Sequence, residues 1–235
     1  MIRAYKRYCI IFAAWLLTGL IASAQAGQNV VLVTGFEPFG GGVTNSSWEA
    51  VQHLDGKHFD NATVIVAQLP VAWGKAENML RALIKIHKPV LVVCFGQAGN
   101  EPVRLENNAH NVREKIPDNE GVVPETGELE AHGPVSLHSA LPLAEIESRL
   151  RKAGIPVILS DDAGTYLCNA VFYTLMHDPD MDGPKSIPRG FIHVPPLNAK
   201  VKSAQGKTVV FDKALLEKTA AIIVETSVAT LIRIP

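Results

Sequence analysis

Cys168 is the side chain of this sequence whose position best suits nucleophilic chemistry. It follows a short apolar run that ends in Ser160-Asp161-Asp162, and it stands just inside an expected helix. If Thr165 caps that helix, Cys168 lies near its third position, where unpaired backbone N–H groups and the helix dipole favour a thiolate. Because the thiolate is the form that attacks carbonyl carbon, this position predicts covalent catalysis by cysteine.

A catalytic cysteine needs a base, and His193 is the first candidate. It ends an apolar strand, where Pro195 and Pro196 block further strand pairing, so its ring is expected at the ligand edge of a sheet. The competing interpretation is a histidine whose hydrogen bonds are satisfied within the strand. His110, which lies in a polar section of the chain, is the rival base.

The acid that orients the base is not determined by spacing. Glu106 follows the Gly96–Gly99 turn, whereas Asp161 and Asp162 directly follow a strand. The pattern around Glu106 by itself favours a solvated charge, and the two aspartates are equally suitable. All three acids therefore stay open on residue pattern alone.

The first 26 residues predict a cleavable secretory signal. A basic start precedes an apolar run from Cys9 to Ala22, and the small residues Ala24 and Ala26 form a cleavage site before Gly27. The apolar run is short for a membrane span. We therefore expect a periplasmic or secreted protein with a signal peptide at 1–26, one domain at 27–235, and no stable membrane association after cleavage.

The composition predicts a globular domain with a sizeable core. Of the 235 residues, 47% are hydrophobic, and the net charge of −1 gives no electrostatic basis for binding nucleic acid. No spacing typical of a metal site is present, and we expect neither a metal nor another cofactor.

Cys94 and Cys168 are the cysteines that follow the predicted signal. In an oxidising compartment a disulfide between them is one interpretation. Cys94, however, lies inside the apolar run 90–95, where cysteine usually serves as a small buried hydrophobe. We expect both thiols to be free.

Apolar, β-branched runs alternate with helical patterns along the chain. Near-continuous apolar strands separated by helices indicate an α/β fold with a largely parallel sheet covered on both faces. The expected strands are 29–34, 63–68, 90–95, 156–159 and 190–194, and the expected helices are 46–53, 72–87, 143–153, 166–177 and 212–231.

Two segments depart from this alternation. Residues 97–141 are long and polar, which is typical of a functional segment, and we expect one or two extra strands there. The loop 35–42 is rich in glycine and carries Phe36 and Phe39 on either side of Pro38. These rings either pack against the core or clamp a small flat ligand, and the sequence leaves both interpretations open.

Several blocks together resemble the pyroglutamyl peptidase family, in order and over nearly the whole chain after residue 26. The family resemblance is carried by Thr34-Gly35-Phe36-Glu37-Pro38-Phe39-Gly40-Gly41, Asn45, Ser47-Trp48-Glu49-Ala50, Gly96-Gln97-Ala98-Gly99, Glu106, Ile116-Pro117-Asp118-Asn119, Ala163-Gly164-Thr165-Tyr166-Leu167-Cys168-Asn169 and Phe191-Ile192-His193-Val194-Pro195.

The resemblance implies an α/β/α sandwich around a mixed sheet and a thiol peptidase that removes N-terminal pyroglutamate from peptides. It implies a triad of Glu106, Cys168 and His193. The implied substrate-binding residues are Phe36, Phe39, Asn45, Gln97, Ile116 and Leu167, with the two phenylalanines on either side of the lactam ring. Members of the family are usually cytoplasmic, and bacterial members are often homotetramers.

Two residues depart from the family pattern. Asn107 stands where members commonly have a basic residue, and Lys115 stands where arginine is expected. Two other functions are alternatives to the peptidase: a protein that binds pyroglutamate or a lactam without turnover, and an amidohydrolase acting on another cyclic amide.

Overall fold

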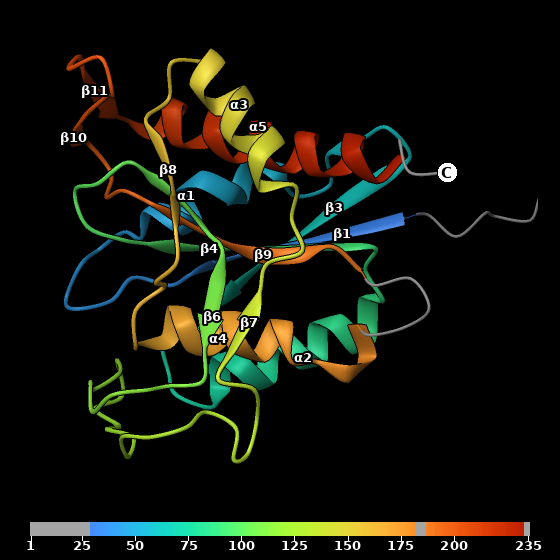
Figure 1. The fold of residues 1–235 in the computed structure, drawn as a ribbon, viewed down its shortest axis with the longest axis vertical. Coiled ribbons are helices and arrows are strands. Elements are labelled where there is room, and N and C mark those ends of the chain that lie inside the picture. Colours follow the sequence, from blue (N-terminus) through green and yellow to red (C-terminus); the bar gives the residue numbers. More distant parts are fainter. Residues whose placement is uncertain (1–28, 182–186, 233–235) are drawn as a thin grey trace, which may run out of the picture.

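The structure, a computed structural model, describes residues 29–181 and 187–232 (Figure 1). The signal peptide predicted at 1–26 lies outside these residues. Within them a central seven-stranded sheet has the order β2-β3-β1-β4-β9-β5-β8. Its strands are β2 (His58–Phe59), β3 (Ala62–Leu69), β1 (Asn29–Phe36), β4 (Leu91–Gln97), β9 (Arg189–Val194), β5 (Val103–Glu106) and β8 (Val157–Ser160).

The sheet is mixed and mostly parallel, as predicted. β3, β1, β4 and β9 run parallel to one another, whereas β2 is antiparallel to β3, and β5 is antiparallel to β9 and parallel to β8. The central strands β1 and β4 are buried over nearly their whole length, which explains their continuous apolar sequence.

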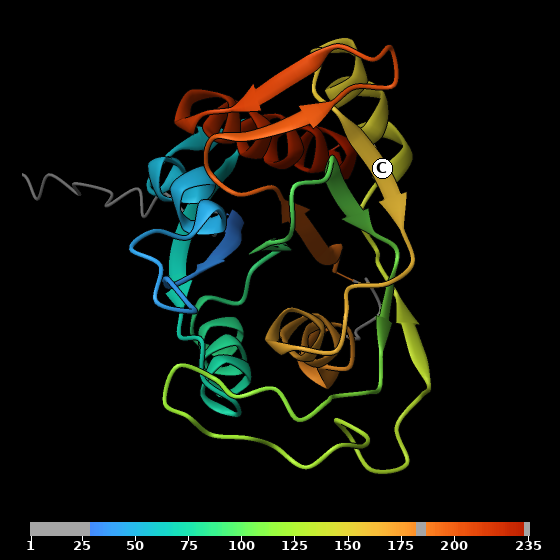
Figure 2. The same cartoon turned by 90° about the vertical axis from the view of Figure 1, so that its left-hand side faces the viewer.

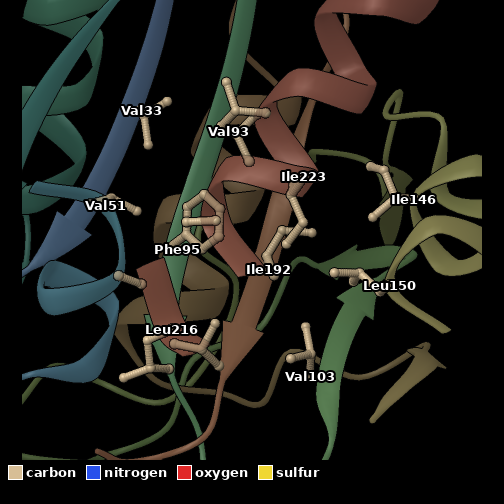
Figure 3. Packing of buried hydrophobic residues seen from close by; sticks show 14 of the residues in the cluster. Val33, Val51, Val93, Phe95, Val103, Ile146, Leu150, Ile192, Leu216 and Ile223 are labelled. Carbon is tan, nitrogen blue, oxygen red and sulfur yellow. The ribbon is translucent and has the colours of Figure 1, made fainter. Parts of the chain in front are cut away.

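Helices cover both faces of the sheet and give the expected three layers. One face carries α1 (Ser46–Val51), α3 (Leu143–Lys152) and α5 (Lys213–Ile232), and the other carries α2 (Lys75–His87) and α4 (Leu167–Met176) (Figure 1). Figure 3 shows the packing beneath α5, where Phe95 and Ile192 of the sheet meet Leu216 and Ile223.

The smaller elements lie at the periphery. β10 (Ala199–Lys202) pairs with β11 (Thr208–Phe211), and two short 3₁₀ helices occupy Gln52–Leu54 and Pro179–Met181. Two predicted helices are shorter than expected. The helix expected at 46–53 becomes a 3₁₀ turn after Val51, and α2 begins at Lys75 rather than at 72 because Gly74 has a φ of +72°.

The connection between β1 and α1 is unusually close. An added Cβ at Gly35 would lie 2.9 Å from the backbone of Ser47 and Trp48, so only glycine lets the strand end pass so near the helix. Asn45 caps α1 by accepting from Ser47 N at 3.0 Å. This turn holds the loop 35–42, which we call the Phe36 loop, at the edge of the sheet.

The polar segment 97–141 carries three strands, where one or two were expected. They are β5, β6 (Asn108–His110) and β7 (Ser136–His138), and the last two pair with each other. Figure 2 shows the chain between β6 and β7 passing outside α2 and α4. Asn169 of α4 fixes this segment from within: it donates to His110 O and Val112 O at 2.8 and 2.9 Å and accepts from His110 N at 2.9 Å.

Among the residues that the structure describes, no helix combines the length and apolar character needed to cross a membrane.

We predict that Asn169→Ala lowers the free energy of unfolding by about 3 kcal/mol, because it leaves three backbone groups of the β6 region without their buried partner. Urea denaturation followed by circular dichroism measures this change. The matched control is Asn78→Ala, which removes an exposed asparagine from α2 and should change the stability by less than about 0.5 kcal/mol. Equal effects of the two substitutions would contradict the role of Asn169.

Candidate active site

The predicted nucleophile and base meet at one cavity, at the edge where β1, β4 and β9 end and α4 begins. Parallel sheets place their ligand sites at this edge. The cavity has a volume of about 180 Å³. It is lined by Phe36, Phe39, Asn45, Val71, Gln97, Arg104, Ala163, Tyr166, Leu167, Cys168 and His193.

Cys168 stands at the second position of α4, because the helix begins at Leu167. Thr165 is not its cap, which corrects the sequence-based expectation: Tyr166 is the N-cap residue, and the Thr165 hydroxyl donates to Glu114 at 3.0 Å. No side chain caps this helix end. The first N–H groups of α4 therefore remain available beside the thiol.

The sulfur of Cys168 lies over Gly96 of β4. A Cβ added to Gly96 would be 2.9 Å from Sγ and 2.8 Å from the Phe191 ring. Glycine at this position is what lets the thiol approach the sheet so closely. The end of β4 thus contributes two features to the cavity. Gly96 leaves room for the thiol, and Gln97 adds a polar side chain to the lining.

Glu106 is the acid that contacts His193. Its Oε1 lies 2.7 Å from His193 Nδ1, and the Glu106 side chain is fully buried. The residue pattern favoured a solvated charge, and that interpretation was wrong, because the polar face of β5 turns toward α4 and the cavity rather than to solvent.

The rival candidates have other partners. Asp161 accepts hydrogen bonds from Asn107 and Asn108, both at 2.9 Å, and Asp162 accepts from Gly164 N at 2.8 Å. The ring of His110 hydrogen-bonds the backbone oxygen of Asp161. None of these three lines the cavity.

The environment of His193 favours the imidazolium. Burial opposes the charged ring, but the charge of Cys168 and its hydrogen bond to His193, together with Glu106, outweigh burial and raise the pKa of His193 to about 9. A thiolate and an imidazolium side by side form the ion pair from which cysteine hydrolases react.

Cys94 has the opposite environment. It is fully buried in β4, and burial raises the pKa of its thiol to about 12 although the Thr34 hydroxyl opposes the shift. Both cysteines are free, so the disulfide considered from the sequence is not formed.

The predicted pocket residues line the cavity that holds the thiol, with the exception of Ile116. Phe36 is buried and packs near Phe191, whereas Phe39 is 38% exposed at the mouth, so the loop both packs and borders the cavity. Ile116 lines an adjacent hollow, which shares Phe39 and Tyr166 with the cavity.

Hydrogen bonds fix the orientation of the polar pocket residues. Gln97 Oε1 accepts from Ser46 N at 2.8 Å, and Asn45 Nδ2 donates to Glu37 O at 2.9 Å. Both residues are therefore part of the framework that joins the Phe36 loop to β4 and α1.

Sequence reasoning missed Arg104 and Tyr166 as residues that line the cavity. Arg104 lines the cavity and donates from Nε to Glu106 Oε1 at 3.0 Å. The signal that could have revealed Arg104 is the alternation of side chains along β5. Arg104 and Glu106 are two residues apart, so they share a face of the strand. Tyr166 is held by a hydrogen bond from its hydroxyl to Pro117 O and by edge contact with Trp73.

The two residues that depart from the family pattern lie away from the cavity. Lys115 forms an exposed ion pair with Glu125 at 2.8 Å, and Asn107 binds Asp161. Within residues 29–181 and 187–232, no three His, Cys, Asp or Glu side chains are grouped closely enough to hold a metal ion.

Comparison with known proteins connects this geometry to a family. The model of the family described as pyroglutamyl peptidase matches residues 29–228. Pyrrolidone-carboxylate peptidase of Bacillus licheniformis is 43% identical over 70% of this chain and 77% of its own length, and that of Klebsiella pneumoniae is 38% identical over 86% and 92%.

Solved structures agree. The crystal structure of pyroglutamyl peptidase I from Bacillus amyloliquefaciens superposes with a TM-score of 0.76 at 35% identity, covering 86% of this chain and 97% of that one. A mutant pyrrolidone carboxyl peptidase from Pyrococcus furiosus gives a TM-score of 0.77 at 31% identity, over 86% and 99% of the two chains. With a family model spanning most of its length, this chain belongs to the pyroglutamyl peptidase family.

Proposed function

We propose that Cys168, His193 and Glu106 are the nucleophile, the acid–base group and the orienting acid of a pyroglutamyl peptidase. Membership of the family makes this chain a cysteine exopeptidase that hydrolyses the bond after an N-terminal pyroglutamate. The observation that carries the assignment of residues is the 2.7 Å contact of the buried Glu106 with His193, beside a thiol in the same cavity.

Acylation begins with the thiolate of Cys168 attacking the carbonyl carbon that joins pyroglutamate to the next residue. The carbonyl oxygen becomes an oxyanion, and the uncapped N–H groups at the start of α4 are candidate donors to it. One such donor is typically worth about 3 kcal/mol of transition-state stabilisation. The imidazolium of His193 then gives its proton to the leaving amine nitrogen, the C–N bond breaks, and a thioester remains.

Deacylation uses the now neutral His193 as a base. Its ring takes a proton from a water molecule, and the hydroxide formed attacks the thioester carbonyl. The C–S bond breaks, Cys168 leaves as a thiolate, and His193 is again protonated. Free pyroglutamate is the product. Glu106 accepts from Nδ1 throughout, which fixes the ring and stabilises its positive charge.

Specificity for the lactam follows from what lines the cavity. Phe36, Phe39 and Leu167 provide apolar walls for a flat ring, with Asn45 and Gln97 at the polar side. None of the described lining residues is an aspartate or a glutamate, so a free N-terminal ammonium would find no carboxylate to bind it. The volume of about 180 Å³ suits one small ring. We place Ile116 at the outer edge, toward the following residue of the peptide.

We predict that the wild-type protein releases arylamine from a pyroglutamyl arylamide and not from the matched prolyl arylamide, which carries a ring ammonium. Cys168→Ser should lower kcat/KM roughly a thousandfold or more, because a hydroxyl at this position is a far weaker nucleophile than a thiolate. A chromogenic assay measures both. The control is Cys94→Ala, which alters a fully buried thiol outside the cavity and should retain most activity. Turnover retained by Cys168→Ser would refute the assignment, and lactam binding without any turnover by the wild type would favour a binding protein.

We predict that Glu106→Gln lowers kcat and moves the alkaline limb of the pH–rate profile downward. In the wild type His193 carries the proton below a pKa of about 9, so activity should fall as the pH rises through about 9. Without the carboxylate charge the imidazolium is less stable, and the limb should shift to lower pH. The matched control is Asp161→Asn, which changes the rival acid and should leave the limb in place. A limb that moves in Asp161→Asn but not in Glu106→Gln would overturn the choice of acid.

We also propose that residues 1–26 are a cleaved export signal, that 27–235 form one catalytic domain, and that the mature protein is a periplasmic or secreted homotetramer. Export is supported by the basic and apolar composition of the segment, and the tetramer by likeness to the family alone. The alternative location is the cytoplasm, which is the family's usual compartment.

We predict an intact mass that begins at Gly27 for protein recovered from the envelope or medium of the host, and a light-scattering mass of four such chains. Fractionation, mass spectrometry and size-exclusion chromatography with light scattering supply these measurements. An uncleaved chain in the cytoplasmic fraction would refute export, and a monomeric mass would refute the tetramer. Neither result would bear on the catalytic residues.

A further inference from the structure

Arg104 is the charged side chain of the cavity to which the reaction above gives no task. Its Nε donates to Oε1 of Glu106 at 3.0 Å, the same oxygen that lies 2.7 Å from His193 Nδ1. Its Nη2 lies 3.2 Å from that Nδ1. The outer nitrogen, Nη1, lies 3.3 Å from a carboxylate oxygen of Glu101. The guanidinium therefore bridges the acid and the base.

Strand pairing determines this arrangement. β5 and β9 are antiparallel, with Arg104 directly opposite His193 and Glu106 opposite Phe191. Arg104 and Glu106 share one face of β5, so both side chains reach the His193 ring from the neighbouring strand. The Arg104 side chain is 21% exposed, whereas that of Glu106 is fully buried.

A carboxylate buried as Glu106 is must have a cation or several donors beside it to stay ionised. Its Oε2 accepts no hydrogen bond from the described residues, so Oε1 makes the contacts. The protonated His193 is one cation. During turnover, however, His193 loses its proton to the leaving amine and is neutral until water is activated. At that stage Arg104 is the cation still in contact with Glu106, and an arginine does not lose its charge in proteins.

We propose that Arg104 is a positioning residue that keeps Glu106 ionised, with Oε1 against Nδ1 of His193, while the imidazole is neutral. An ionised Glu106 holds the proton of the neutral ring on Nδ1 and leaves Nε2 free to accept a proton from water. A protonated Glu106 would donate to Nδ1 and favour the tautomer that cannot act as the base. The proposal rests on the proposed function of Cys168, His193 and Glu106.

The charges around Glu106 determine the direction of the expected effect. Facing it is His193 from β9, which in turn interacts with Cys168 at the start of α4, and Glu101 lies beyond Arg104 on the solvent side. At the end of β8, Asp161 is hydrogen-bonded to Asn107 and Asn108. Removing the positive charge of Arg104 makes the site more negative, which favours the protonated form of both Glu106 and His193. Both limbs of the pH–rate profile should then move to higher pH.

The test compares Arg104→Gln with Arg104→Lys and with Glu101→Gln in the full enzyme. The readouts are the pH dependence of kcat and kcat/KM on a pyroglutamyl arylamide, and the pH dependence of alkylation of Cys168 by iodoacetamide, which needs no turnover. We expect Arg104→Gln to shift both limbs to higher pH by about one unit. The substitution should also lower kcat by a larger factor than it changes KM. Arg104→Lys should restore the limbs, because it keeps the charge. Glu101→Gln, the matched control, removes only the outer partner of Arg104 and should leave the limbs in place.

Limbs that stay in place in Arg104→Gln, whatever its kcat, would overturn the proposal, and so would an Arg104→Lys profile that moves as far as that of Arg104→Gln. Circular dichroism and thermal unfolding show whether each variant is folded. If Arg104→Gln does not fold, Arg104→Met replaces it with a neutral side chain of similar length and the same two outcomes apply. If the wild type lacks activity, the proposed function fails. The alkylation profiles then still show whether Arg104 alters the pH dependence of the Cys168–His193 pair.

Discussion

The contact between Glu106 and His193 is the constraint on which the rest of the site depends. Both side chains are buried, so neither can hold its charge without the other or a neighbour of opposite sign. The contact requires the strand that carries Glu106 to lie beside the strand that carries His193. β5 does so by turning back after β4 within a few residues and running antiparallel to β9. The mixed character of the sheet therefore has a chemical consequence.

The alternation of the fold could be predicted from the sequence because each strand and helix has its own local pattern. β1 and β4 are apolar and largely buried, and α3 lies within the helix range expected at 143–153. Local pattern fails where the outcome depends on partners distant in sequence. Val103-Arg104-Leu105-Glu106 alternates like a half-exposed strand, yet its polar face turns toward α4 because β5 pairs with β9. The burial of Glu106 could not be deduced without that pairing.

The residues of the site differ in the same way in how much of their placement depends on local pattern. The position of Cys168 at a helix start has a local signature in the sequence, although Thr165 is not the cap that the pattern predicts. His193 likewise has a local signature, its place at a strand end. The contacts of Arg104 arise from the register across two strands, which no local pattern reveals. Residue pattern also does not separate Glu106 from Asp161 and Asp162, whereas family likeness does, and in the structure Glu106 is the acid in contact with His193.

The proposed export would place Cys168 in an oxidising compartment, where catalysis requires the thiol to stay reduced, and the structure bears on its possible disulfide partners. The other cysteine of the described chain, Cys94, is a poor partner for disulfide formation, because burial keeps its thiol protonated and exchange needs a thiolate. Cys168 itself is half-buried among the residues that line the cavity, which include Phe36, Leu167 and Gln97. The environments that expose one thiol to the cavity and bury the other therefore leave Cys168 without an intramolecular disulfide partner among the described residues.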